Sequence, residues 1–267
     1  MIPYPFQYRR AKSLAEAEAL LAATPGAKLL AGGQTLIAAM KMRLANPPEL
    51  IDISGLKELN FVRADPGILT IGAGTPHHAV ATAAATVRTI PALARMAEGI
   101  GDPAVRHMGT IGGSLANNDP AADYPAAALA LNATMKTTRR SIGADAFFTG
   151  MFSTALEEDE ILTEIAFPIP EKAGYCKFRN PASRYAMPGV FVAKGRAGVR
   201  VAVTGAGPCV FRVPEMEAAL ARDFSPAAIA SIRLDPAELT SDIHASAEYR
   251  AHLVTAMAGR AVAEALA

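Results

Sequence analysis

The sequence predicts an α+β fold, and three observations lead to this prediction. The first fifty-odd residues alternate short apolar runs with helical patterns. A cluster of prolines and charges near 169–174 then interrupts the pattern, and a strand-rich segment with glycine turns follows it. The last stretches are helical, so strands and helices are segregated in this second part, as in α+β proteins.

The first part begins with a helix and ends with a strand. Ser13 is a suitable N-cap, and Pro25 and Gly26 end the helical pattern behind it. Pro47 and Pro48 end the next helical pattern, because proline cannot continue a helix. The predicted elements are a helix over 13–26, a strand over 27–33, a helix over 34–47 and a strand over 49–54.

The middle of the chain mixes strands and helices. The turn Asp65-Pro66-Gly67 joins two predicted strands, and Thr75-Pro76 marks a helix start. The other predicted elements are a helix over 90–100, a glycine corner with a loop, a helix and a strand over 109–138, and a strand over 157–170 that ends in prolines.

The part behind the boundary contains a few antiparallel strands over 175–213 and helices over 214–232 and 244–266. Pro188 falls inside a strand-like run, "MPGVFVA". Because proline cannot donate to a strand ladder, this position predicts a sheet edge or a bulge.

Composition excludes several functional classes. The 267 residues are 51% apolar and carry a formal net charge of +1, which argues against a broad nucleic-acid or anionic-membrane surface. No apolar run approaches the roughly 18 residues of a spanning helix. The first residues, "MIPYPFQYRR", show no apolar signal core, so the cytoplasm is the expected location.

Cysteine and histidine usage predicts no metal site in this chain. Two cysteines, Cys176 and Cys209, cannot build a disulfide framework or a four-thiolate cluster. Of five histidines only His77 and His78 are neighbours, and adjacent side chains point in different directions. These two are expected to be solvated residues of a loop or helix start.

Two glycine corners share the pattern apolar-x-Gly-Gly-x-x: "LAGGQTLIAA" at 30–39 and "TIGGSLANN" at 110–118. Paired glycines leave the main chain bare, and free backbone N–H groups form a ready anion site. No lysine or arginine lies between Leu29 and Met40. A diphosphate held by amides fits this pattern, with hydroxyls of Thr35, Thr110 and Ser114 as further donors. Tight turns or internal packing would also explain both corners.

Two carboxylates follow the second corner in "NNDPAADYPAA". Asp119 and Asp123 fit turn and N-cap roles. They equally fit acceptors for sugar or ribityl hydroxyls. Neither corner has the G-x-G-x-x-G or the Walker spacing, so a nicotinamide or nucleoside-triphosphate site of the usual kinds is not predicted.

Four segments together resemble one family: "AGGQTL", "RHMGTIGGSLANNDPAADYPAAAL", "KFRNPASRYAMPGV" and "HASAEYRAHL". The chain resembles, over nearly its whole length, the FAD-binding medium subunit of molybdenum hydroxylases of the aerobic carbon monoxide dehydrogenase and xanthine dehydrogenase type. The resemblance implies a two-part FAD-binding domain of the vanillyl-alcohol oxidase (PCMH) type over 1–172, with subparts of about 1–56 and 57–172. A C-terminal domain of the carbon monoxide dehydrogenase flavoprotein type, a three-stranded antiparallel sheet plus helices, would span 173–267.

The resemblance also implies a set of FAD-binding residues. The first corner would wrap the diphosphate and part of the adenosine side with Leu29, Leu30, Ala31, Gly32, Gly33, Gln34, Thr35 and Leu36. The second corner would add backbone donors from Thr110, Ile111, Gly112, Gly113 and Ser114. Gln34 departs from the His or Asn of many relatives.

Six further residues are implied outside the corners. Asn117 would lie near the flavin ring, and Asp123 would bind ribityl or ribose hydroxyls. Ile100 would pack on a flavin or adenine face, or belong to the core at a helix end. Leu162 would offer backbone contacts, and Tyr185 would stack near the flavin. Lys177 would approach the isoalloxazine, where a positive charge stabilises the anion formed on reduction, or else be a solvated strand lysine.

The function implied by the resemblance is electron transfer, with no catalytic residue and no metal ligand in this chain. FAD would collect electrons from iron–sulfur clusters of a small subunit and deliver them to an external acceptor. A large subunit would hold the molybdenum–pterin centre, in a dimer of heterotrimers. Two cysteines exclude the subgroup with an extra cluster in this subunit. The alternatives are a stand-alone FAD oxidoreductase on the same fold and a bridging scaffold without FAD.

Overall fold

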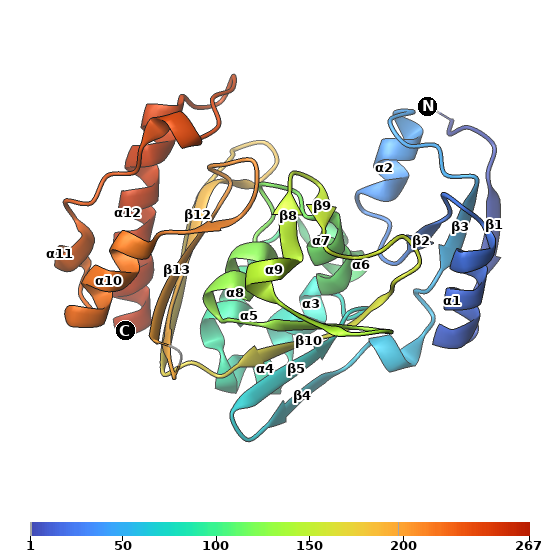
Figure 1. Cartoon of the computed structure of the whole chain (residues 1–267), viewed down its shortest axis with the longest axis horizontal. Coiled ribbons are helices and arrows are strands. Elements are labelled where there is room, and N and C mark those ends of the chain that lie inside the picture. Colours follow the sequence, from blue (N-terminus) through green and yellow to red (C-terminus); the bar gives the residue numbers. More distant parts are fainter. Residues whose placement is uncertain (1, 197) are drawn as a thin grey trace.

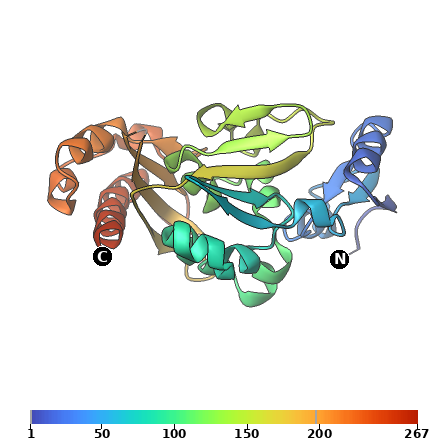
Figure 2. The ribbon, with the colours of Figure 1, turned by 90° about the horizontal axis from the view of Figure 1, so that it is seen from below.

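The computed structural model describes residues 2–196 and 198–267. Three sheets lie side by side along the long axis (Figure 1). The blue N-terminal part and the red C-terminal helices lie at opposite ends in both views (Figures 1 and 2). The middle sheet lies between them.

The N-terminal part is a small parallel sheet of order β1-β3-β2 with two helices. Its elements are β1 (Gln7–Arg10), α1 (Leu14–Ala23), β2 (Lys28–Leu30), α2 (Leu36–Lys41) and β3 (Glu49–Asp52). Ser13 caps α1 as predicted, since its Oγ accepts a hydrogen bond from the Glu16 N–H at 3.2 Å. The structure adds β1 in front of the predicted elements.

Helix α2 is shorter than the prediction over 34–47. Arg43 adopts a left-handed backbone conformation, with φ +61°, directly after the C-cap Met42. That conformation is incompatible with a continuing helix, so α2 ends well before Pro47.

The middle part is built on a five-stranded antiparallel sheet of order β4-β5-β10-β6-β7. Its strands are β4 (Val62–Asp65), β5 (Ile68–Gly72), β6 (Thr134–Thr137), β7 (Ser141–Gly143) and β10 (Leu162–Pro168), and a hairpin of β8 (Phe148–Gly150) and β9 (Ser153–Thr154) stands apart. Its helices are η1 (Lys57–Leu59), α3 (His77–Thr82), α4 (Ala84–Thr89), α5 (Pro91–Glu98), α6 (Pro103–Met108), α7 (Ile111–Asn117), α8 (Tyr124–Ala130) and α9 (Ala144–Phe147).

The C-terminal part is an antiparallel sheet of order β11-β12-β13-β14 with helices on one face. It comprises β11 (Lys172–Arg179), β12 (Ala186–Gly195), β13 (Gly198–Thr204), β14 (Phe211–Arg212), α10 (Pro214–Arg222), α11 (Pro226–Ile229), η2 (Pro236–Glu238) and α12 (Ala247–Leu266). The three long strands are the predicted ones, and the two-residue β14 extends the sheet at one edge. The division of the chain at residue 172 stays a prediction.

Pro188 lies at a bulge. Strand β12 is central rather than an edge, because it pairs with both β11 and β13. Between the pairs Lys177–Gly189 and Arg179–Ala186, β12 contains one residue more than β11. Because of this extra residue, no hydrogen bond of the strand ladder needs an N–H group at Pro188.

The C-terminal sheet contributes to two cores. Phe191 and Ala193 of β12 point into the core of the middle part, whereas Val190 and Val192 face the core shared with α10 and α12. This alternation is the two-residue period of a strand that is covered on both faces. The C-terminal and middle parts are therefore packed together through one sheet.

Arg250, in the "SAEYR" segment, connects α12 to the ends of two strands. Its buried guanidinium donates to the carbonyls of Met187, at 2.9 Å, and Gly205, and pairs with Asp242 at 2.7 Å. Removing one partner of such a buried charge is costly. The segment that characterises the resemblance is thus a structural anchor.

Among the described residues, none of the helices combines the length and apolarity needed to cross a membrane. The same residues contain no group of three or more His, Cys, Asp or Glu side chains placed to hold a metal ion.

Candidate cofactor site

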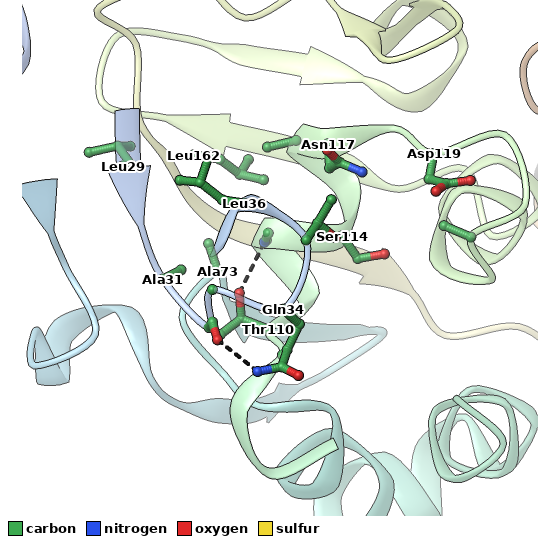
Figure 3. Close-up of a pocket in the computed structure, with 18 of the residues that line it drawn as sticks. Leu29, Ala31, Gln34, Leu36, Ala73, Thr110, Ser114, Asn117, Asp119 and Leu162 are labelled. Atoms are coloured by element: carbon green, nitrogen blue, oxygen red, sulfur yellow. Dashed lines mark hydrogen bonds between the residues drawn. The ribbon is translucent and has the colours of Figure 1, made fainter. Parts of the chain in front are cut away.

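A cavity of about 690 Å³ lies between the N-terminal and middle parts, and both glycine corners line it (Figure 3). Its volume lies in the range typical of small-molecule sites. The predicted residues that line it are Leu29, Leu30, Ala31, Gly32, Gly33, Gln34, Thr35, Leu36, Ile100, Thr110, Gly112, Gly113, Ser114, Asn117, Asp123, Leu162 and Tyr185.

Two predicted residues do not line the cavity. Ile111 is fully buried in the core of the middle part, because it is the first residue of α7 and its side chain packs inward. Lys177 lies behind Asp123, and only 4% of its side chain is exposed. Whether these or the other predicted residues bind FAD stays a prediction.

The first corner presents unused backbone donors. The amides of Gly32, Gly33, Gln34 and Thr35 donate to no other described residue. Gly33 has φ +69°, a left-handed conformation that turns the chain from β2 into α2. The Gln34 side chain donates back to the Gly32 carbonyl at 3.2 Å (Figure 3) and does not occupy these amides. A cluster of free N–H groups of this kind is suited to an anion.

The second corner uses most of its amides within the chain. The Ile111 and Gly112 N–H groups donate to the Thr75 and Ala73 carbonyls at 3.1 and 2.8 Å. The Gly113 N–H donates to Thr110 Oγ1 at 3.0 Å, the N-cap bond of α7. The Ser114 N–H donates to the Thr110 carbonyl at 3.0 Å, so four of the five predicted backbone donors are engaged inside the chain. The fifth, the Thr110 N–H, donates to no other described residue. Its side-chain donors at the cavity are the hydroxyls of Thr110 and Ser114 (Figure 3).

The glycines of both corners permit close packing of the main chain. A Cβ on Gly32 would collide with the Met108 carbonyl, just before the second corner. A Cβ on Gly112 would lie 2.5 Å from Ala73 Cβ and 2.6 Å from the Ala73 carbonyl oxygen. Side chains at these positions would push the corners away from their neighbours.

Asp123 is the buried acceptor of a three-residue cluster. Lys177 Nζ lies 2.9 Å from each of its carboxylate oxygens, and the Tyr175 hydroxyl donates to it. Burial and the Asp123 charge raise the pKa of Tyr175 well above its ordinary value. Asp123 stands at the N-cap position of α8, as predicted, but its side chain makes no cap bond. Burial rules out a solvated Lys177. Asp119 does make its predicted turn bond, to the Ala121 N–H at 2.9 Å.

His77 was not predicted as part of the site. It begins α3 as expected, but it is 5% exposed rather than solvated, and it lines the cavity. Burial, with the Arg106 charge second, lowers its pKa to about 4. Its Nδ1 has no hydrogen-bond partner within the described chain. The imidazole is therefore neutral at physiological pH and packs against Gly109, next to the second corner.

Several further lining residues carry no sequence signal. They include Lys28, Phe152, Glu158, Glu160 and Arg184. All except Lys28 lie far along the chain from the glycine corners. Only the tertiary fold brings them to the cavity. Asp119, which the sequence offered as a possible acceptor, also lines the cavity.

Comparisons with known proteins identify the family of the chain. A family model described as the FAD binding domain in molybdopterin dehydrogenase matches residues 4–170. The carbon monoxide dehydrogenase medium chain of Hydrogenophaga pseudoflava is 35% identical, over 100% of this chain and 97% of that protein. The nicotine 6-hydroxylase medium subunit of Paenarthrobacter nicotinovorans is 34% identical, over 97% of this chain and 96% of that subunit.

A solved structure also matches the whole chain. A carbon monoxide dehydrogenase structure from Hydrogenophaga pseudoflava superposes with a TM-score of 0.89 at 33% identity, and the match covers 100% of this chain and 99% of that one.

Proposed function

The chain belongs to the family of FAD-binding domains of molybdopterin dehydrogenases, and from this premise we propose that it is the FAD-carrying electron-transfer subunit of a multi-subunit molybdenum hydroxylase. The resemblance inferred from the motifs, the FAD-binding fold and FAD as cofactor are confirmed. The subunit would receive electrons from iron–sulfur clusters of a small subunit and pass them to an external acceptor.

One observation carries the assignment of the cofactor to this cavity. Gly32 to Thr35 of the first corner, whose amides donate to no other described residue, line a cavity of about 690 Å³ whose other wall is the second corner. A diphosphate between two ring systems needs such donors in the middle of an elongated site. The residues present therefore fit FAD.

The chain's own residues would hold and orient the cofactor. We propose that the amides of Gly32 to Thr35 bind the diphosphate, and that the hydroxyls of Thr110 and Ser114 donate to it from the opposite wall. Asp123, fixed by Lys177 and Tyr175, would accept hydrogen bonds from ribityl hydroxyls. When bound, FAD supplies a ring system that takes up electrons singly and releases them in pairs.

Lys177 would act on the flavin through Asp123 rather than by direct contact. Its ammonium is buried and lies 2.9 Å from both Asp123 oxygens, so its positive charge is balanced by the carboxylate. We propose that its role is to hold the Asp123 carboxylate in place.

The partners follow from the same assignment. Medium chains of near-equal identity, 35% and 34%, belong to enzymes named for carbon monoxide and for nicotine. The sequence of the medium subunit therefore does not indicate which substrate the enzyme uses. We propose a large molybdenum-binding subunit that selects the substrate and a small iron–sulfur subunit, arranged as a dimer of heterotrimers.

The stand-alone oxidoreductase is weaker as a second candidate. It would need its own acid or proton donor in the cavity. Of the described lining groups, Asp123 and Glu160 are held in ion pairs, and His77 has a pKa of about 4. Glu160, whose pKa is lowered to about 2, and His77 are not poised to exchange a proton near neutral pH. The Asp123 carboxylate is already bonded to Lys177 and Tyr175.

The experiment is an absorbance spectrum of the affinity-purified chain, followed by acid release of any chromophore. Bands near roughly 370 and 450 nm that release FAD support the proposal. Co-purification of a molybdenum-containing and an iron–sulfur subunit would support the partners. A colourless chain that fails to take up added FAD would overturn the cofactor assignment.

A further inference from the structure

The hairpin of β8 and β9 brings an exposed aromatic ring to the cavity. Met151 and Phe152 form its tip and are 55% and 57% exposed. Phe152 lines the cavity, whereas Met151 does not. An apolar ring of this size left open to water loses the stabilisation that a covering surface would provide.

Phe152 is held in a costly backbone conformation. Its φ is +52°, in the left-handed region, where a bulky side chain is an outlier. Such a conformation persists only where the surroundings impose it, and it is concentrated at functional sites. Glycine or asparagine would occupy this position with less strain.

Asn118 imposes the conformation. Its Nδ2 donates to the carbonyls of Gly150 and Ser153, both at 2.8 Å, and the Phe152 N–H donates to the Asn118 carbonyl at 3.2 Å. Asn118 is buried and is the C-cap of α7, the helix that begins at the second corner. The hairpin is therefore fixed to the helix that forms one wall of the cavity.

Phe152 lies at the end of the cavity that the predicted roles of Asn117 and Tyr185 assign to the flavin. Asn117 and Asp119, on either side of Asn118, line the cavity there. The Ala186 N–H donates to the Ala121 carbonyl at 3.4 Å, which brings Tyr185 to the same end. Phe152 thus shares its end of the cavity with Asn117 and Tyr185, the two residues that the resemblance places near the flavin, and with Asp119.

We propose that Phe152 is a cofactor-binding residue whose ring packs against the isoalloxazine of FAD. The inference rests on the proposed function. Planar rings pack well on aromatic faces, and the hairpin bonds hold the ring ready before the cofactor arrives.

The experiment uses the full chain, freed of flavin and titrated with FAD by flavin fluorescence. In Phe152→Asn the ring is lost but the left-handed backbone is kept. We expect FAD binding about tenfold weaker. Urea unfolding without FAD should show no loss of stability, because asparagine tolerates this φ. A ring whose role is only structural would lower stability and leave affinity unchanged.

Two controls and one competitor sharpen the result. Phe152→Tyr keeps the ring and should bind FAD within about twofold of the wild type. Met151→Ala removes the other exposed tip residue and should leave binding unchanged. ADP lacks the isoalloxazine, so its affinity, measured by displacement of FAD, should be the same in Phe152→Asn and wild type.

Three outcomes would overturn the inference. They are wild-type FAD affinity in Phe152→Asn, an equal loss of ADP affinity, or loss of partner subunits from the purified complex with FAD binding intact. The last result would make the hairpin tip a docking surface. If the wild-type chain itself bound no FAD, the proposed function would fail as well, and that outcome is distinguishable from the other three.

Discussion

The two glycine corners have the same sequence pattern and opposite hydrogen-bonding states. The amides of the first, Gly32 to Thr35, bond to no other described residue, whereas those of the second, Ile111 to Gly113, are all engaged. Topology explains the difference. The first corner follows β2, an edge strand, so no further strand lies beside it. The second lies against the end of β5, whose neighbouring carbonyls of Ala73 and Thr75 accept its amides.

The comparison teaches that a Gly-Gly pattern marks a close approach of the main chain without saying what approaches. At the sheet edge Gly32 packs on the Met108 carbonyl, and the amides of Gly32 to Thr35 stay open for the proposed ligand. Beside a strand end the partner is the protein itself. Changes in the first corner should therefore affect cofactor affinity, and changes in the second should affect stability.

The largest expected effect is on stability, in the second corner. In Gly112→Ala the new Cβ would meet Ala73 at 2.5–2.6 Å, partly against backbone. We expect the free energy of unfolding without FAD to fall by about 3 kcal/mol, measured by urea denaturation. Gly113→Ala is the matched control, because its Cβ would meet a single side-chain atom, Thr110 Oγ1 at 2.9 Å, and no backbone atom. It should change stability by less than about 1 kcal/mol; equal losses in both variants would refute the packing role.

Acid should lower the free energy of unfolding, because His77 packs beside the same corner in its neutral form. The pKa of His77 is lowered to about 4 in the folded chain. Its contribution to folding stability is therefore complete above its ordinary pKa of 6.5 and is lost as the pH falls from 6.5 toward 4. The wild type should lose about 2 kcal/mol between pH 7.5 and pH 5 in urea unfolding.

His77→Gln, which does not titrate, should lose correspondingly less over this range. The pKa of Glu160 is lowered to about 2, so its contribution to stability is lost only below its ordinary pKa of 4.5. Glu160 therefore does not affect the stability change between about pH 7.5 and pH 5, which is assigned to His77. Identical pH profiles for wild type and variant would contradict the burial of a neutral imidazole.

Gly33→Ala tests the first corner. An alanine at φ +69° costs about 1–2 kcal/mol, and its Cβ would press on Leu30 and Ile37 at 3.1–3.2 Å. The amides would move, so FAD affinity should fall at least tenfold in a fluorescence titration. Gly143→Ala, in open space, should leave affinity unchanged. Wild-type affinity in Gly33→Ala would remove the main support for amide binding of the diphosphate.

The smallest effect separates the two hydroxyls of the second corner. Ser114 makes no side-chain bond within the described chain, so Ser114→Ala should weaken FAD binding by about 1 kcal/mol and leave stability unchanged. Thr110 caps α7, so Thr110→Val should lower both quantities, stability by about 1 kcal/mol. Calorimetry with and without FAD measures both. An unchanged affinity in both variants would exclude the hydroxyls as donors.

Local signals predicted much of the fold. Ser13 capped its helix as expected, and the bulge at Pro188 follows from the missing N–H. The length of helix α2 was overestimated, because no residue in "MRLANP" predicts the left-handed backbone conformation of Arg43. The glycine corners were located correctly at the cavity by their pattern.

The unpredicted features depend on residues far apart in the sequence. The Lys177–Asp123 pair joins residues 54 positions apart, and the amides of the second corner are taken by carbonyls of another strand end. Burial of His77 depends on Tyr124, whose ring lies 5.3 Å away. Phe152 reaches the cavity only because Asn118 binds its hairpin. Periodicity and spacing contain no information on such pairings.

Amide hydrogen exchange of the full chain, with and without FAD, tests the central claim most directly. The amides of Gly32 to Thr35 should exchange rapidly without FAD and become protected when it is bound. Those of Ile111 to Gly113 should be protected in both states, because the chain itself bonds them. FAD-dependent protection at 111–113, with 32–35 unchanged, would contradict the account and assign the diphosphate to the second corner.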